Sequence, residues 1–386
     1  MVLFLSSCAN LDKMKDVIWY HGMVYDKLTK SVIGTRLYNR FLSLYLCDSY
    51  DKVIALPPSL HTLNIGYDYD KPLVFPPTLK HLSVVSLYYR EIKLPPNLVS
   101  FTFHGCYRGP MVFPPTLTSL ELADSYDEVL TLPPSLKILI LGSSYNQLLS
   151  LPDGLTTLKL GNYYKQPLSL PPGLTDLELG YYYNQPLVFP SSLIRLTIDS
   201  KYEQPFTLPE NLRYFKICCN CSHPLVFPPS LTTLDIGNNY NQPLNLPQNL
   251  TTLNLGDNYD QPLNLPKGLT TLCLGYSYNQ QLYLPPKLTT LNLGYKYNQP
   301  LKLPKKLETF KMGRLYNRKI TFPRELTTLI VGKCYSHLVV VPPKLVNLKL
   351  KNKHAKLGPL PKTLESLKIG HKYTSQGALK IMIGEK

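Results

Sequence analysis

YNQPLNLPQNLTTLNLGDN, from Tyr240 to Asn258, begins again at Tyr259 as YDQPLNLPKGLTTLCLGYS. Counting in steps of nineteen residues in both directions gives seventeen units, from Tyr50 to His354, with no insertion or deletion between them. Self-similarity at a fixed period is typical of repeat architectures, so it decides how the rest of the chain is interpreted. Positions within a unit are numbered from this tyrosine, which is position 0.

One half of each unit is predicted to form a strand. Position 10 is Leu in every unit, position 13 is Leu or Phe, and position 15 is always apolar, whereas positions 12 and 14 are mostly polar. This alternation has the period of two that a half-buried strand requires. Gly follows at position 16 in most units, where we expect it to permit the turn. The segment LTTLNLG is therefore predicted to be a short strand and its turn.

The other half of the unit cannot be a helix. Position 7 is Pro in every unit, from Pro57 to Pro361, and a second Pro often follows it. This half should be extended or polyproline-like, with positions 4 and 6 directed into the core. The predicted fold is mainly β, a solenoid of 19-residue coils with one parallel sheet and an extended opposite wall. Such coils are stable only collectively, because each buries its Leu residues against its neighbours.

Two further positions are expected to form ladders along the solenoid. Tyr at position 0 should stack on the tyrosines of the neighbouring coils. Asn or Asp at position 1 should cap backbone groups of the turns. We interpret both ladders as structural features and not as binding sites. The position 1 residues on which this rests are Asn146, Asn184, Asn241, Asp260, Asn279 and Asn298.

The repeat resembles two known families. Its L-x-x-L-x-L core resembles a leucine-rich repeat, in a short form. The fuller motif, an aromatic residue followed by Asn-Gln-Pro-Leu, Leu-Pro and L-T-T-L-x-L-G, resembles the FNIP repeat over about residues 41–386. That family is typical of social amoebae and of the giant viruses that infect amoebae. Cys221 and His354 depart from its aromatic position. The resemblance implies a leucine-rich-repeat-like solenoid that binds other proteins, and it implies no catalytic residue and no cofactor.

Residues 1–40 lack the repeat period and form a separate predicted segment. Apolar residues between Leu5 and Gly22 have roughly helical spacing, so we expect a small helical cap over the first coil. The run L-x-S-C-x-x-L followed by Ile18 and Trp19 also resembles the last third of an F-box. An F-box would imply that residues 5–22 bind a Skp-type adaptor of a cullin-type ubiquitin ligase. The Leu-Pro element with which an F-box begins is absent, and we favour the cap.

The outward positions of the strands are the candidate protein-binding surface. Position 14 varies in chemistry from unit to unit while the core positions stay fixed, as a recognition surface would require. Plain solvated surface explains the same variation, and both interpretations stay open. The most varied cluster combines positions 12 and 14 of four successive units. Its candidate protein-binding residues are Lys159, Asp176, Glu178, Arg195, Tyr214 and Lys216.

Charge is concentrated at the C-terminal end of the chain. Residues 301–386 contain 19 Lys and Arg against 4 Asp and Glu, a net charge of +15 out of +16 for the chain. Such a patch could attract nucleic acid, acidic lipid or an acidic protein, with nucleic acid the less favoured partner, and it could also be a solubilising end. The candidate basic patch consists of Lys311, Arg314, Lys333, Lys349, Lys351, Lys353 and Lys368.

Composition and motifs argue against other classes of protein. No stretch approaches the roughly 20 apolar residues of a membrane-spanning helix, so no membrane partner is expected. The 8 cysteines fall at scattered positions of the repeat, which favours reduced thiols and a cytoplasmic location. The run CCNCSH, from Cys218 to His223, lacks the second pair of ligands that a zinc site needs. Sequence divergence of this one repeat therefore explains the run better than zinc binding does. No phosphate loop, dinucleotide fingerprint, nucleophile elbow or H-E-x-x-H motif occurs. We therefore expect a non-enzymatic protein without metal or cofactor.

Overall fold

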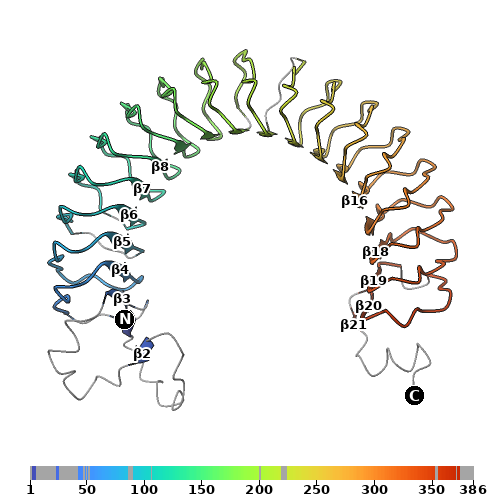
Figure 1. Cartoon of the computed structure of the whole chain (residues 1–386), viewed down its shortest axis with the longest axis horizontal. Coiled ribbons are helices and arrows are strands. Elements are labelled where there is room, and N and C mark those ends of the chain that lie inside the picture. The colour runs from blue at the N-terminus through green and yellow to red at the C-terminus, as the bar shows by residue number, and fades with distance from the viewer. Residues whose placement is uncertain are drawn as a thin grey trace. The chain divides into compact units, whose positions relative to one another are not determined.

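The chain forms two compact units, unit 1 (Met1–Leu193) and unit 2 (Ile194–Lys386). The computed structural model describes residues 2–5, 23–25, 42–46, 48, 50, 53–85, 90–105, 107–199, 201–218, 224–352, 355–370 and 372–373. Strands are the only regular elements in these ranges, and no helix there has the length and apolarity that crossing a membrane requires. In each unit the strands lie side by side along one wall, and the irregular halves of the coils form the opposite wall (Figure 1).

Unit 1 is a parallel sheet whose strands follow the repeat. Its strands are β1 (Val2–Leu5), β2 (Met23–Tyr25), β3 (Ser43–Leu46), β4 (Thr62–Ile65), β5 (His81–Val84), β6 (Ser100–Phe103), β7 (Ser119–Leu122), β8 (Ile138–Ile140), β9 (Thr157–Lys159) and β10 (Asp176–Leu179). From β3 to β10 each strand pairs with the next. Residues at the same repeat position lie opposite each other on neighbouring strands. For example, Thr62 of β4 lies opposite His81 of β5.

Unit 2 repeats this arrangement. Its strands are β11 (Arg195–Ile198), β12 (Tyr214–Ile217), β13 (Thr233–Ile236), β14 (Thr252–Asn254), β15 (Thr271–Cys273), β16 (Thr290–Asn292), β17 (Thr309–Lys311), β18 (Thr328–Val331), β19 (Asn347–Leu350), β20 (Ser366–Ile369) and β21 (Lys372–Tyr373). From β11 to β20 every strand is parallel to the next and in the same register. The last strand, β21, is antiparallel to β20. The predicted solenoid with one parallel sheet wall is thereby confirmed within each unit.

The N-terminal segment contains strands. β1 pairs parallel with both β2 and β3, with Leu3 opposite Leu44, so β1 and β2 extend the sheet of unit 1. The predicted helix is wrong at Leu5, its first residue, which belongs to β1. Residues 6–22 lie outside the described part of the chain, as do the residues on either side of the predicted boundary at 40. That boundary, and the helix over 6–22, stay predictions.

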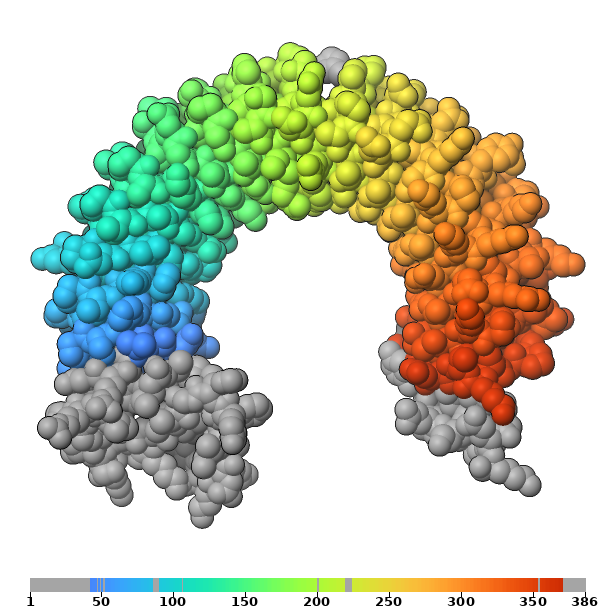
Figure 2. Space-filling view, viewed as in Figure 1, coloured from blue at the N-terminus to red at the C-terminus, as the bar shows by residue number. Residues whose placement is uncertain are grey.

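The core is formed by the positions that the alternation predicted. Positions 13 and 15 are buried and position 12 is not, as in Leu234 and Ile236 of β13 beside the half-buried Thr233. From the opposite wall Leu244 and Leu246, at positions 4 and 6, are buried in the same core. A turn follows Pro at position 7, and the N–H of position 10 donates to its carbonyl oxygen, as Leu250 does to Pro247 at 3.2 Å. Neighbouring coils of each unit lie against one another along the wall (Figure 2).

Both predicted ladders are present. In unit 2 the ring of Tyr278 is fully buried and stacks on Tyr259 and on Tyr297, with 6.2 Å between ring centroids in each pair. Beside them the backbone N–H of Asn279 donates to Oδ1 of Asp260 at 2.8 Å, and the next coil repeats the bond, from Asn298 to Asn279 at 2.9 Å. From coil to coil, a side-chain oxygen therefore accepts a hydrogen bond from a backbone N–H group of the next turn. Without this bond the N–H group would lack a partner within the protein.

Glycine at position 16 is required for a different reason from the expected one. Among the described residues only Gly370 has a positive φ, of 60°. In nine other coils with Gly at this position the backbones of neighbouring coils approach closely, so that a Cβ on Gly275 would overlap the carbonyl oxygen of Gly256. A Cβ would overlap backbone atoms of the preceding coil along two glycine columns. They consist of Gly142, Gly161 and Gly180 in unit 1, and of Gly237, Gly256, Gly275, Gly294, Gly313 and Gly332 in unit 2.

The tyrosine ladder makes stability sensitive to alkaline pH. Burial raises the pKa of Tyr316 from 10.0 to about 12, with a smaller contribution from Tyr335, and burial likewise raises the pKa of Tyr126 to about 12. Above pH 10 the folded chain therefore holds more protons than the unfolded chain, so stability is complete below pH 10 and falls as pH rises toward 12. We expect cooperative unfolding in that window.

Circular dichroism and the ultraviolet absorbance of phenolate, recorded together during an alkaline titration, check this expectation. Most of the phenolate signal should appear together with the loss of the strand signal. A sample already unfolded in urea is the control, and there the tyrosines should titrate together near pH 10. Ionisation of the tyrosines near pH 10 with the strand signal intact would contradict the prediction.

Candidate binding surface

The outward side chains of the sheet form a continuous surface in each unit, here named the strand face. It consists of positions 12 and 14, which alternate with the buried positions 13 and 15 and are half-buried or exposed. In unit 1 position 14 carries Tyr45, Asn64, Ser83, Thr102, Glu121, Ile140, Lys159 and Glu178. In unit 2 it carries Thr197, Lys216, Asp235, Asn254, Cys273, Asn292, Lys311, Ile330, Lys349 and Lys368. Core packing fixes the direction of these side chains and leaves their chemistry free.

Three of the candidate protein-binding residues lie at the C-terminal end of unit 1. Lys159 of β9 stands opposite Glu178 of β10, with 3.5 Å between Nζ and Oε2. Both side chains are about half exposed, so the ion pair contributes little to stability. Oδ2 of Asp176 accepts a hydrogen bond of 2.9 Å from Oγ1 of Thr175. The register thus brings Lys159 and Glu178 together, as expected from their equal repeat positions.

The other three lie at the start of unit 2. The guanidinium carbon of Arg195 lies 4.3 Å from the ring centroid of Tyr214, which is cation–π geometry. Lys216 stands opposite Asp235 on the next strand. Burial raises the pKa of the Asp235 carboxyl group, and the positive charge of Lys216 partly offsets this rise. Arg195 and Tyr214 are together as expected, while the binding role of all six residues stays a prediction.

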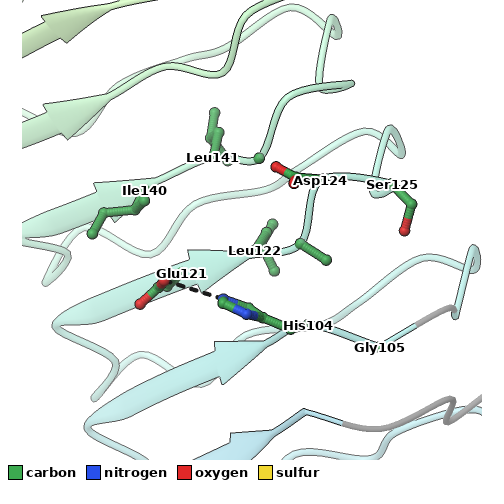
Figure 3. A pocket seen from close by; sticks show the side chains of 10 residues that line it. His104, Gly105, Glu121, Leu122, Asp124, Ser125, Ile140 and Leu141 are labelled. Atoms are coloured by element: carbon green, nitrogen blue, oxygen red, sulfur yellow. Dashed lines mark hydrogen bonds and ion pairs between the residues drawn. The ribbon is translucent and has the colours of Figure 1, made fainter. Parts of the chain in front are cut away.

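Unit 1 also contains a cavity of about 370 Å³ at the ends of β6, β7 and β8 (Figure 3). Nε2 of His104 lies 3.1 Å from Oε1 of Glu121, and the two side chains form one side of the cavity. Asp124 lies on the loop after β7 and accepts hydrogen bonds from the N–H and Oγ of Ser143, which hold its pKa below the usual value. The cavity combines positions 14, 16 and 17 of successive coils and was not predicted from the sequence.

Basic residues gather at the C-terminal end of unit 2. Lys311, Lys349 and Lys368 share position 14 on β17, β19 and β20, and Lys351 follows the end of β19. Burial lowers the pKa of Lys351, and the positive charges of Lys311 and Lys349 lower it further, so these amines lie close enough to repel one another. Arg314 and Lys333 are exposed on the loops after β17 and β18. Lys353 lies outside the described residues. Of the predicted patch, the structure brings Lys311, Lys349, Lys351 and Lys368 together at one end of the strand face.

An aromatic column next to these cations was missed. The rings of Tyr276 and Tyr295 stack 4.5 Å apart. The guanidinium carbon of Arg314 lies 5.2 Å from the centroid of Tyr295, and Nζ of Lys296 lies 5.5 Å from that of Tyr276. Tyr276, Tyr295 and Arg314 share position 17 of successive units. Aligning that position would have revealed the column.

No metal site is found where the structure describes the chain. Groups of His, Cys, Asp and Glu that could hold an ion are absent from those residues. Cys218 follows β12 at position 16, and burial raises the pKa of its thiol. Cys219 to His223 lie outside the described residues.

The comparison with known proteins agrees with this architecture. Short parallel strands with buried Leu at fixed positions, one coil per repeat, define a leucine-rich-repeat-like solenoid. The chain carries FNIP repeats, and the FNIP Repeat family matches residues 128–163, 145–182, 164–201, 222–258, 240–277 and 259–296. No curated protein matches the chain in sequence.

Two solved structures are similar over most of the chain. The structure of CroV588, described as a novel circular leucine-rich-repeat protein and coming from a giant virus, has a TM-score of 0.70 and 26% identity. The similarity covers 87% of this chain but only 60% of that one, so this chain spans less than two thirds of its length. YopM from Yersinia enterocolitica has a TM-score of 0.59 and 22% identity over 83% of this chain and 89% of its own. The second similarity concerns the fold alone.

Proposed function

We propose that the chain is a non-enzymatic scaffold of the cytoplasm that binds a protein partner on its strand face. The observation that supports this most is the difference between positions within one strand. Positions 13 and 15 are apolar and buried in coil after coil, whereas position 14 changes from Thr197 to Lys216 to Asp235 within three coils. A surface of that kind can be fitted to a partner without disturbing the core, which is how solenoids form binding surfaces.

Site-specific crosslinking tests the proposal with a matched pair of asparagines in the repeat from Tyr240 to Asn258. Asn254 lies at position 14 on β14, whereas Asn245 is exposed between the buried Leu244 and Leu246 on the opposite wall. A photoreactive amino acid replaces either residue in the full chain, and the protein is irradiated in amoebal lysate. We expect discrete protein adducts from position 254 that excess unlabelled protein abolishes, and none from position 245. Equal adducts from both positions, or none from either, would contradict a strand-face scaffold.

A link to a cullin-type ubiquitin ligase, which the F-box resemblance implies, is a finer prediction. Leu5 would begin the adaptor-binding helix, and its place in β1 favours the cap instead. Mass spectrometry of the same lysate samples tests it, because a functional F-box remnant should recover a Skp-type adaptor whatever the position of the crosslinker. Absence of the adaptor from samples that contain strand-face adducts would exclude the link.

A further inference from the structure

A shallow hollow of about 160 Å³ lies on the strand face of unit 2, across β18, β19 and β20. Three strands line it with a polar residue at position 12, and two of them add a lysine at position 14. The register places these side chains in two parallel rows. The position 12 residues are Thr328, Asn347 and Ser366, and the position 14 residues are Ile330, Lys349 and Lys368.

The polar groups in this hollow are suited to a compact anion. Thr328, Asn347 and Ser366 each offer a hydroxyl or amide donor, and the two lysines offer ammonium groups. Donors from adjacent strands are separated by about 4.8 Å, so several can reach one group with multiple oxygen atoms. A phosphoryl group carries three acceptor oxygens and close to two negative charges at neutral pH. Charge-assisted hydrogen bonds of this kind are among the stronger ones in proteins.

The surrounding charge favours the same ligand. Positions 12 to 18 of the last four repeats, residues 309–315, 328–334, 347–353 and 366–372, contain no Asp or Glu. Three acidic residues precede these segments: Glu325 at position 9 is paired with Lys344 at 2.7 Å, and Glu308 and Glu365 are exposed at position 11. They are outnumbered by Lys311, Arg314, Lys333, Lys349, Lys351 and Lys368. Burial lowers the pKa of Lys351, and the positive charges of Lys311 and Lys349 lower it further. A bound dianion would offset the repulsion between these three amines.

We propose that the hollow of β18–β20 binds a phosphoryl group presented by a peptide segment of a protein partner. This rests on the proposed scaffold function, because that function makes the partner a protein. Nucleic acid fits the hollow less well. Cations already cover the neighbouring rings, with Arg314 over Tyr295 and Lys296 over Tyr276, so this column is not an open platform for bases.

Fluorescence anisotropy with the full chain tests the proposal. The probes are a labelled acidic peptide with one phosphoserine, the same peptide with serine, and a labelled single-stranded oligothymidylate. The test variant is Lys349→Gln with Lys368→Gln. The control variant is Lys305→Gln with Lys306→Gln, which removes the same charge from exposed turn residues at positions 8 and 9. Circular dichroism and thermal midpoints verify that both variants are folded.

We expect the chain to bind the phosphoserine peptide at least about tenfold more tightly than the serine peptide. The test variant should reduce this preference to about threefold or less, and the control should leave it within about twofold. Equal affinity for both peptides, or an equal loss in both variants, would overturn the site. Tighter binding of the oligothymidylate through Lys349 and Lys368 would replace it with a nucleic-acid site. Inorganic phosphate that competes as well as the phosphopeptide would show that the peptide contributes nothing.

The two proposals can fail separately. If crosslinking at Asn254 gives adducts but the phosphopeptide does not bind, the scaffold function stands and the phosphoryl site is wrong. If the phosphopeptide binds through Lys349 and Lys368 but no adduct forms at Asn254, the hollow is an anion site and the extended strand face is not the scaffold surface.

Discussion

Replacing Gly275 by alanine is expected to destabilise unit 2 by about 3 kcal/mol or more, because the added Cβ overlaps the backbone of the preceding coil. The obstacle is the carbonyl oxygen of Gly256, which cannot rotate away as a side chain could. Separation of the two coils would relieve the overlap, but it would also disrupt the ladders on either side of it. Since each coil is stable only against its neighbours, the damage should spread beyond one repeat. Urea unfolding followed by circular dichroism measures the effect as a lower midpoint or a second transition.

Gly268→Ala provides the matched control in the same repeat. The nearest atoms to a Cβ at Gly268 are carbonyl oxygens at 3.6 and 4.0 Å, which is ordinary contact, and its φ is not positive. Alanine there should be neutral or should stabilise by up to about 1 kcal/mol, because it restricts the unfolded chain. If both substitutions cost the same, close approach between coils is not the reason for the glycine column.

Tyr278→Ala is expected to cost about 3–5 kcal/mol, the usual range for removing a large buried aromatic side chain. Tyr278 is 0% exposed and stacks on both of its neighbours in the tyrosine ladder, so the substitution leaves a cavity in the core and ends two ring contacts. The measurement is again the urea midpoint and slope of the full chain, compared with wild type.

Tyr278→Phe separates the ring from its hydroxyl group. Among the described residues the Tyr278 hydroxyl is buried without a hydrogen-bond partner, so removal of the oxygen should change stability by less than about 1 kcal/mol. The same substitution should shift the onset of alkaline unfolding slightly upward, because one buried phenol no longer ionises. A loss as large as that of Tyr278→Ala would show that the hydroxyl, and not ring packing, stabilises the ladder.

The sequence predicts the periodic part of this structure well because one register governs every coil. Once Leu234 is assigned to the core, equal positions in later units must follow, and so must the stacking of Tyr278 and the capping by Asp260. The same 19-residue register places Lys159 opposite Glu178. Features without the period were not predictable in this way. β1 lies between β2 and β3, out of chain order, and its spacing from β2 is twenty-one residues, from Val2 to Met23.

The candidate sites were only partly predictable for a related reason. The register fixes which backbone positions are neighbours, but the cavity beside His104 depends on how far side chains at three different positions reach. The hollow beside Lys349 likewise combines two positions on three strands. The Tyr276–Tyr295 column uses a single position, and alignment of the units alone would have revealed it.

The glycine columns also determine where the ends of the strands can display chemistry. Within the two columns, position 16 is closed to any side chain, whatever the neighbouring residues are. Beyond the ends of the columns, the same position carries side chains. His104 and Ala123 occupy two of these places and line the cavity of unit 1, and Lys351 occupies another beside the hollow of unit 2. An engineer who wished to install a new binding group at this edge would begin at such positions, since the columns themselves have no room for a side chain.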